Sequence, residues 1–315
     1  MNISHHREVK ACLIDGGSSR FRWQMWLALL ACVGLSWASG CASMQMDSGP
    51  MRPETIHAVT SSNQLLSFNA GRPGEVMNRK AITNLRPGEN MLGIDFRPAD
   101  GKLYALGSTG RLYTIDPSSG MASQVGSGTF ALALGGNNFG FDFNPAADRI
   151  RVVSDSGQNL RLHPDSGAVV DADAKMDGIQ PDGQLTYAAA DKHAGSKPII
   201  VAAAYTNSVA GAKATTNFAI DAASGMLVTQ GSREGMTPAV SPNSGQLFTV
   251  GPLGINTSGM VSFDIAAKSG TAYTSLTPSG ATASGFYWID LQTGKASLIG
   301  TVGGGQSITA FAIAP

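Results

Sequence analysis

The chain has 315 residues, with 22 Lys and Arg residues against 22 Asp and Glu residues, so its formal net charge is zero. This balance excludes the strongly basic surface on which nucleic-acid binding depends. Hydrophobic residues make up 43% of the chain, which is enough to bury a core and excludes a disordered polymer. Charged residues, at 14%, are fewer than the usual share of about 25%, and the 39 glycines exceed the usual share of about 7%. The composition therefore indicates a globular protein rich in turns.

The N-terminal segment has the order of parts that is typical of a secretory signal peptide. Residues 23–37 are uncharged and mostly apolar, arginines precede them, and small residues follow. The apolar run is shorter than the about 20 residues of a membrane-spanning helix. Cys41 comes next, and the tail WASGC resembles the lipobox of bacterial lipoproteins, in which the cysteine is lipidated and becomes the mature N-terminus. We expect a lipoprotein-type signal over residues 1–41. Its alternatives are a lipobox ending at Cys32 and a plain secretory signal.

The residues around Cys41 also bear on location and on domain boundaries. Ala42, rather than Asp, follows the cysteine, which in bacterial lipoproteins implies sorting to the outer membrane. We expect an outer-membrane lipoprotein facing the periplasm or the cell surface, with a periplasmic or secreted protein as the alternative. No cysteine follows Cys41, which excludes disulfides and cysteine-based zinc sites in the mature protein. Residues 42–54 are expected to form a flexible tether, and residues 55–315 the folded domain.

The folded domain is repetitive. Residues 93–120 and 140–167 align without a gap, as GIDFRPADGKLYALGSTGRLYTIDPSSG and GFDFNPAADRIRVVSDSGQNLRLHPDSG. Each copy has an alternating apolar strand, a turn through Pro and Asp, and two more strands separated by a Ser/Gly turn. Residues 260–294 form a looser third copy. Repeats of about 40–50 residues with four short strands are typical of β-propeller blades.

The two ends of the domain complete a ring. Residues 307–315 resemble an innermost strand with no blade after it, and residues 55–82 supply outer strands without an innermost one. Pairing these segments would close the ring and remove open sheet edges. We therefore expect an all-β protein, a five-bladed β-propeller with blades near 91–126, 139–176, 184–252 and 259–302 plus the closing blade. Six blades are the alternative, if residues 231–257 form a unit of their own.

These motifs resemble a known bacterial family. The segments FGFDFNPAADRIRVVSDSGQNLRLHPDSG, AAYTNSVAGAKATTNFAIDAASG and FYWIDLQTGKASLIGTVGG are similar to the family called domain of unknown function 4394. The resemblance covers about residues 57–315. It implies export and a β-propeller-like fold, and it implies no activity.

One polar group of residues is dense enough to suggest a ligand site. Asp142 and Asn144 alternate on one strand, as do Arg149 and Arg151, so each pair shares a strand face. If the strand at 141–144 is innermost, its polar face would look into the channel and orient a polar ligand. The alternative is that these side chains brace neighbouring strands. The candidate ligand-binding residues are Asp142, Asn144, Arg149, Arg151, Asn159, Arg161 and Asn207, the last of which alternatively ends a strand in a turn.

Metal and catalytic motifs are weak. Asp142 and Asn144 offer oxygen ligands for calcium, and so does the acidic stretch DADAKMDGIQPDG at residues 171–183. That stretch has Lys175 and Met176 where a calcium loop needs an acidic or amide residue and glycine, so we expect a solvated acidic loop, with a looser calcium site as the alternative. The domain has three histidines, His57, His163 and His193, and His163 replaces a turn aspartate of the other copies. A histidine-based zinc site or triad has little support.

We therefore expect a binding or scaffold module of unknown activity at the bacterial envelope. Its expected partners are the membrane, through the lipid anchor, and an unidentified protein or glycan ligand, with no nucleic acid. The first alternative is a calcium-assisted hydrolase or lactonase-like enzyme with its site in the channel. The second is a purely structural envelope protein. No cofactor other than calcium is indicated.

Overall fold

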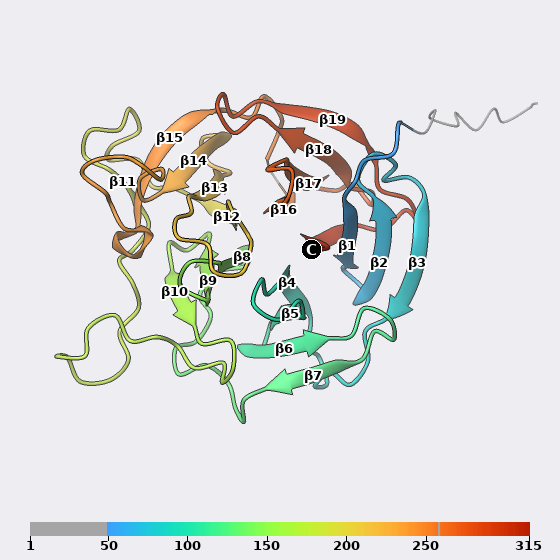
Figure 1. Cartoon of the computed structure of the whole chain (residues 1–315), viewed down its shortest axis with the longest axis horizontal. Helices are drawn as coiled ribbons and strands as arrows, with labels where there is room; N and C mark the ends of the chain where they lie inside the picture. Colours follow the sequence, from blue (N-terminus) through green and yellow to red (C-terminus); the bar gives the residue numbers. More distant parts are fainter. Residues whose placement is uncertain (1–48, 258) are drawn as a thin grey trace, which may run out of the picture. The chain divides into compact units, whose positions relative to one another are not determined.

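Short strands make up the regular structure of this protein. The computed structural model describes residues 49–257 and 259–315, so the signal segment and Cys41 lie outside the described residues. Within them, twenty strands form five sheets, and the one helix is the 3-10 turn η1 (Pro242–Ser244). No helix among these residues has the length and apolar character needed to cross a membrane. The five sheets stand as blades around a central channel (Figure 1), which confirms the predicted five-bladed β-propeller.

Each blade places one innermost strand along the channel. We number the blades 1 to 5 in the order of the ring, and each innermost strand neighbours the next (Figure 1). The innermost strands are β20 (Ile308–Ile313), β4 (Met91–Phe96), β8 (Phe139–Asn144), β12 (Ile200–Tyr205) and β16 (Gly259–Ile265).

The outer strands follow in order within each blade, and all their pairings are antiparallel except that of β11 with β15. Blade 1 adds β1 (Thr55–Thr60), β2 (Gln64–Asn69) and β3 (Val76–Ala81), and blade 2 adds β5 (Leu103–Gly107), β6 (Arg111–Ile115) and β7 (Ala122–Val125). Blade 3 adds β9 (Arg149–Ser154) and β10 (Asn159–Leu162). Blade 4 adds β13 (Asn217–Asp221), β14 (Met226–Gln230), β15 (Gln246–Pro252) and β11 (Thr186–Tyr187). Blade 5 adds β17 (Ala272–Pro278), β18 (Gly285–Ile289) and β19 (Ala296–Thr301).

The ends of the folded domain meet in blade 1, as the sequence predicts. Strand β20 pairs antiparallel with β1, with Val59 opposite Ala310. This pairing makes β1 an interior strand of its sheet and leaves β20 as the innermost strand along the channel. The six-blade alternative is wrong, because residues 246–252 form β15, which pairs with β14 inside blade 4.

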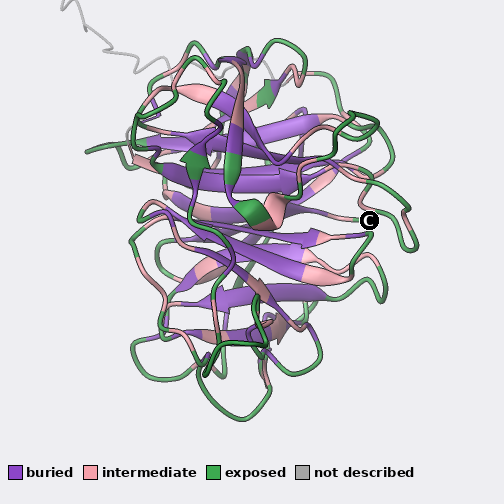
Figure 2. Cartoon of the chain, turned by 90° about the vertical axis from the view of Figure 1, so that its left-hand side faces the viewer, coloured by how far each residue is buried: buried purple, intermediate pink, exposed green. Residues whose placement is uncertain are grey.

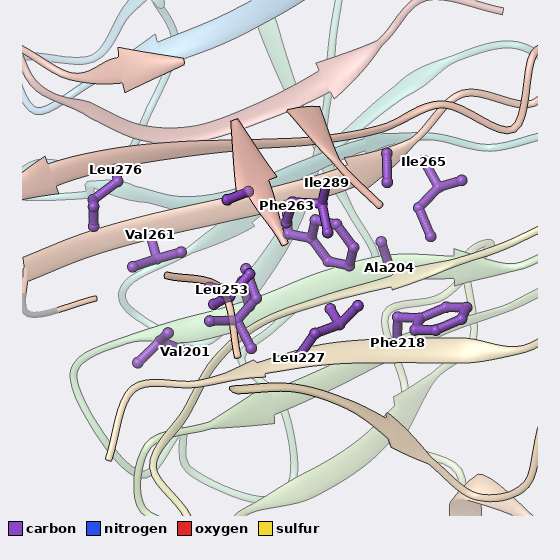
Figure 3. Close-up of a cluster of buried hydrophobic side chains, with 14 residues drawn as sticks. Val201, Ala204, Phe218, Leu227, Leu253, Val261, Phe263, Ile265, Leu276 and Ile289 are labelled. Atoms are coloured by element: carbon purple, nitrogen blue, oxygen red, sulfur yellow. The ribbon is translucent and has the colours of Figure 1, made fainter. Parts of the chain in front are cut away.

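The hydrophobic core is divided among the interfaces between blades. Burial is concentrated in the strands, while the connecting turns are mostly exposed (Figure 2). Between blades 4 and 5, Leu227 and Phe218 from blade 4 lie across from Phe263 and Ile289 of blade 5 (Figure 3). Four further clusters fill the remaining interfaces in the same way. The alternating apolar residues of each blade therefore hold it to its neighbours rather than to one central core.

Small residues let the innermost strands approach one another closely. A Cβ atom added at Gly140 of β8 would lie 2.6 Å from the backbone nitrogen of Ala203 in β12. A Cβ added at Gly93 of β4 would lie 2.4 Å from the Cβ of Phe141. Both distances are too short for carbon, so these two glycines set the spacing between blades 2, 3 and 4.

Residues 49–54, in the expected tether, contact the propeller. The Arg72 side chain donates from Nε to the Gly49 carbonyl, and the Arg52 backbone N–H donates to Asn69 Oδ1. Glu54 is buried, and its carboxylate accepts hydrogen bonds from Ser269 and Tyr273 of blade 5. The described part of this segment is therefore bound to blades 1 and 5 rather than free, because it satisfies polar groups that these blades bury.

Candidate functional site

Three aspartates from three blades converge at the centre of the channel. Asp95, Asp142 and Asp264 lie on β4, β8 and β16, and one carboxylate oxygen from each lies within 4.8 Å of the others. They occupy equivalent places in the motifs GIDF, GFDF and SFDI of the repeat. Only Asp142 was among the candidates from the sequence. Sequence reasoning missed the other two, although the recurrence of Asp at the same place of the repeat could have identified them.

Each of these carboxylates joins its blade to the next one. Asp95 of blade 2 accepts a hydrogen bond from the backbone N–H of Phe143 in blade 3 (2.8 Å), and Asp142 of blade 3 accepts one from that of Tyr205 in blade 4 (2.9 Å). Asp264 of blade 5 accepts one from the backbone N–H of Ile313 in blade 1 (2.7 Å). Asp95 and Asp264 also accept the N–H of the residue that follows them. Bracing of neighbouring strands, the alternative that we gave for the polar group, therefore describes what Asp142 does.

Burial and mutual repulsion favour the protonated form of the three carboxyls. Burial raises the pKa of Asp95 and of Asp142 well above the ordinary value, and the charge of Asp264 raises both further. Burial raises the pKa of Asp264 to about 7. The backbone N–H groups that donate to these carboxylates oppose the shift without cancelling it.

The channel beside the aspartates is narrow. Gly93, Gly140 and Ser262 stand two residues before the three aspartates, so they lie on the same strand faces. They help to line a cavity of about 10 Å³, together with residues of β12 and β20 such as Ala202 and Ala310. This volume fits one water molecule or ion and leaves no room for an organic substrate.

A second polar site, which we call the arginine pocket, lies between blades 3 and 4. It is a cavity of about 160 Å³ near the ends of β8 and β12 and the start of β9. Arg151 lies opposite Arg161 in the pairing of β9 with β10, so the two guanidinium groups share one face of blade 3. The pocket is lined by Asn144, Ala147, Arg149, Arg151, Arg161, Tyr205, Ser241, Pro242 and Asn243.

Arg151 forms the floor of the arginine pocket. It is 2% exposed, and it donates to the Tyr205 hydroxyl (3.1 Å), to Asn159 Oδ1 (2.9 Å) and to Asn243 Oδ1 (2.6 Å). Its charge is balanced by Asp182, whose Oδ2 lies 2.6 Å from Arg151 Nη1. These contacts come from blades 3 and 4 and from η1, so the side chain is fixed in place before any ligand arrives.

Arg161 and Arg149 form the more open wall. Arg161 makes a two-point ion pair with Asp182, through Nε (2.8 Å) and Nη2 (2.7 Å). Arg149 donates to the backbone carbonyl of Asp148 and forms no ion pair with the described residues. Three guanidinium groups therefore face one carboxylate, which leaves the pocket with an excess of two positive charges.

Several donors of the pocket have no acceptor among the described residues. They are the Nη1 group of Arg161, most of the Arg149 guanidinium and the hydrogen of the Tyr205 hydroxyl, which itself accepts from Arg151. The Asn144 carboxamide oxygen accepts from the N–H groups of Ala146 and Ala147, so its amide nitrogen is the part left for a ligand. A pocket with more donors than acceptors suits an anion.

The structure brings most of the sequence candidates together. Asn144, Arg149, Arg151 and Arg161 line the arginine pocket, and Asn159 lies behind it with its amide donating to the carbonyls of Gly183 and Pro242. Asp142 instead faces the channel.

Asn207 lies apart from the other candidates. It lines a separate, open depression of about 620 Å³ and donates to the Ala214 carbonyl and to Glu234.

Sequence reasoning missed three residues of the arginine pocket. Asp182 appeared as the last acidic residue of an exposed loop, yet it is buried beneath two arginines. Tyr205 and Asn243 belong to blade 4 and reach the pocket only because β12 and η1 lie beside blade 3. No local pattern marks such contacts, which span up to 92 positions in the chain.

The family model for a domain of unknown function, DUF4394, matches residues 64–312. The chain belongs to this family. This match confirms the resemblance seen in the repeat motifs, and the family's description names no activity. No curated protein is similar to the chain in sequence.

The chain matches solved structures at low similarity. A chain of a nidogen/laminin complex is 12% identical with a TM-score of 0.40, and the match covers 83% of this chain and 98% of that one. Glutaminyl cyclase from Myxococcus xanthus is 13% identical with a TM-score of 0.40, over 72% of this chain and 90% of the cyclase. These matches do not indicate an activity for this chain.

Proposed function

We propose that this protein is a ligand-binding module of the bacterial envelope whose arginine pocket holds a small anion, or the anionic end group of a larger protein or glycan ligand. The observation that carries the proposal is the excess of two positive charges in a preformed cavity with unpaired donors. Guanidinium groups bind carboxylates and phosphates through paired hydrogen bonds, which makes arginine the usual residue for such ligands. The volume of about 160 Å³ is below that of a drug-sized site, so a small group suits it.

The location is part of the same proposal. The lipobox-like tail ending at Cys41 supports a lipid anchor that holds the propeller at the outer membrane. We expect the Cys41→Ala variant to leave the membrane fraction and appear in the soluble fraction of fractionated cells. Membrane retention of that variant equal to wild type would argue against Cys41 as the anchor.

Calorimetric titration of the purified protein with small anions at low ionic strength tests the pocket. We expect at least one of acetate, glucuronate, phosphate and sulfate to bind, and Arg149→Ala to weaken that binding by about 10-fold to 100-fold, since a hydrogen bond to a charged group contributes about 1.5–3 kcal/mol. Arg149 suits the test because it carries no ion pair in the fold.

Arg79→Ala is the matched control for this titration. Arg79 is exposed on β3, the outermost strand of blade 1, and the substitution removes the same charge. We expect it to leave the affinity unchanged. Equal losses in both variants would mean that net charge, and not the pocket, attracts the anion, and no binding by any of the four anions would reject the proposal.

The second candidate function is the calcium-assisted hydrolase. The convergence of Asp95, Asp142 and Asp264 favours a cation in the channel, because carboxylate oxygens are the ligands that calcium prefers. The adjoining cavity of about 10 Å³ speaks against a substrate next to that cation. Cation binding without catalysis is therefore the form of this candidate that the geometry favours.

Thermal unfolding with and without calcium at pH 8 tests the second candidate. At this pH Asp264 is ionised, and a bound cation would favour ionisation of Asp95 and Asp142, whose pKa values burial raises, so that all three carboxylates could coordinate it. We expect a calcium-dependent rise in Tm that is absent in Asp264→Asn if the channel holds calcium. An unchanged Tm in wild type would dismiss it.

A further inference from the structure

We infer that the arginine pocket selects a tetrahedral dianion, that is a phosphate monoester group or a free phosphate or sulfate ion, over a singly charged carboxylate. The inference rests on the proposed function, since it presumes that the pocket binds an anion. It names the chemical class of that anion from the charge balance, the direction of the donors and the exposure of the pocket.

The charge balance is the first argument. Both oxygens of Asp182 are engaged in ion pairs, with Arg151 and Arg161, and Arg149 has no acidic partner among the described residues. Two positive charges stay uncompensated. A dianion neutralises both, whereas a monocarboxylate leaves one charge of the pocket without a partner. Because partly buried charges are costly when they are unpaired, the dianion gains more from the site.

The neighbouring charges do not remove this excess. Arg97 pairs with Asp148, next to Arg149 in the chain, and with Asp165 and Asp100. This group has more negative than positive charge, and the charge of Arg149 also acts on Asp148, but Asp148 is 39% exposed and Asp165 is 79% exposed. Solvent and salt screen such exposed charges over about 10 Å, so they act on the pocket less than its own guanidinium groups do.

The direction of the donors is the second argument. Arg149 and Arg151 come from β9, Arg161 from β10 and the Tyr205 hydroxyl from β12, so the donors surround the cavity from three strands. A single guanidinium satisfies a planar carboxylate with two parallel hydrogen bonds. A tetrahedral anion presents three terminal oxygens in different directions, and it can use donors from all three strands at once.

The exposure of the pocket is the third argument. Arg151 and Tyr205 are buried at the floor, while Arg161 is 22% exposed and Arg149 is half-buried. The terminal oxygens of an ester group can reach the floor while the ester substituent extends past Arg149 into solvent. The chemistry of recognition is therefore the same for an ester group on a small metabolite and for one on a larger envelope molecule.

Titration calorimetry with four ligands separates the classes and the sources. Glycerol 3-phosphate represents a phosphate ester, and inorganic phosphate represents the free phosphate ion. Inorganic sulfate represents a tetrahedral dianion with sulfur in place of phosphorus, and glucuronate represents a carboxylate. At pH 7.5 and low salt we expect glycerol 3-phosphate or sulfate to bind at least 10-fold more tightly than glucuronate. Tight binding of inorganic phosphate but not of the ester would assign the pocket to the free ion. Tight binding of sulfate alone would assign it to the free sulfate ion.

The pH dependence of the affinity distinguishes recognition of a dianion from a nonspecific attraction between charges. The second pKa of a phosphate ester is about 6, so the dianion falls to about one tenth of the ligand at pH 5. We expect the affinity for glycerol 3-phosphate to fall about 10-fold from pH 7.5 to pH 5, and the affinity for sulfate to stay nearly constant.

The variants separate failure of the inference from failure of the proposed function. Arg149→Ala should weaken the dianions more than glucuronate, and Arg149→Lys should restore part of the difference, because lysine keeps the charge and loses the planar fork. If glucuronate binds more tightly than both phosphate and sulfate, and Arg149→Ala loses that binding, the preference for a dianion is wrong. The proposal that the pocket binds an anion would then still hold. No binding of any ligand would reject both.

Discussion

Asp182 holds two guanidinium groups with one carboxylate. Its side chain is 1% exposed, and its two oxygens lie 2.6 Å from Arg151 Nη1 and 2.7 Å from Arg161 Nη2. A buried ion pair contributes little net stability when both partners are present, but removing one partner leaves a buried charge uncompensated. Asp182 is therefore the residue on which the arrangement of the arginine pocket depends.

Asp182→Asn should lower the free energy of unfolding by about 3–5 kcal/mol, because it leaves Arg151 without a counter-charge in the interior. Urea unfolding of the variant and of wild type measures the difference. Asp165→Asn is the control, since its ion pair with Arg97 is exposed and should contribute about 1 kcal/mol or less. If the pocket binds anions, sulfate should recover part of the stability lost in Asp182→Asn. A variant as stable as wild type would show that Asp182 has no structural role.

At the scale of the strand, the spacing between blades depends on glycines, because they have no side chain where two innermost strands meet. Strand β8 carries Gly140 where it meets β12, and the backbone of β12 occupies the space that a Cβ would need. Two residues later the same strand carries Asp142, which accepts the Tyr205 N–H of β12. The close approach allowed by the glycine and the hydrogen bond made by the aspartate belong to one contact between blades 3 and 4.

Gly140→Ala should destabilise the protein by about 1–3 kcal/mol, because the added methyl would force β8 away from the backbone of β12. Gly128→Ala is the matched control: this glycine has open space around it and does not need a positive φ. We expect the control to change stability by no more than about 0.5 kcal/mol. Chemical denaturation measures both variants, and equal effects would contradict the close-packing argument.

At the scale of the whole molecule, the ring is joined at its centre by the three aspartates. They link blades 2 and 3, 3 and 4, and 5 and 1, so a change in their ionisation acts on most of the ring at once. The pKa of Asp264 is raised to about 7 in the folded state. In the unfolded chain it returns to the ordinary value of 3.8.

The pH dependence of stability follows from these values. Between pH 4 and 7 the folded state binds more protons than the unfolded state, so the free energy of unfolding should fall as pH rises, by as much as about 4 kcal/mol from Asp264. The raised pKa values of Asp95 and Asp142 act in the same direction. Asp264→Asn should reduce this slope, and Asp177→Asn, in an exposed loop, should keep it. Urea unfolding from pH 4 to 8 checks both, and a wild-type stability that rises with pH over this range would contradict the expected ionisation.

Periodicity and turn chemistry predicted the architecture because each blade is a local unit. The 28-residue copies at 93–120 and 140–167 contain whole sets of strands, and their Gly120 and Gly167 end the turns with the positive φ that the pattern requires. The closing strand was predictable because the domain has an unpaired strand at each end, and these two strands can pair with each other. Local patterns of this kind can be recognised in a sequence wherever buried and exposed residues alternate along a strand.

The sites were predictable only in part, because they are built between blades. Arg151 and Arg161 could be placed on one face from their strands, but their partners Asp182 and Asn243 come from irregular segments whose path no periodicity reveals. Asp182 was misjudged because acidic residues in glycine-rich stretches are usually solvated. Only the three-dimensional contacts distinguish it from its exposed neighbours Asp171, Asp173 and Asp177.

The pairing of β1 with β20 also bears on when the ring can form. Thr309 donates through its hydroxyl to the carbonyl of Val59, 250 positions earlier in the chain. Closing so long a loop is slow compared with forming a hairpin, and it requires the last strand to be present. A chain that emerges from the ribosome N-terminus first can assemble blades 2 to 5 as local units, but blade 1 waits for the final residues. Completion of the fold therefore has to wait until β20 has been synthesised.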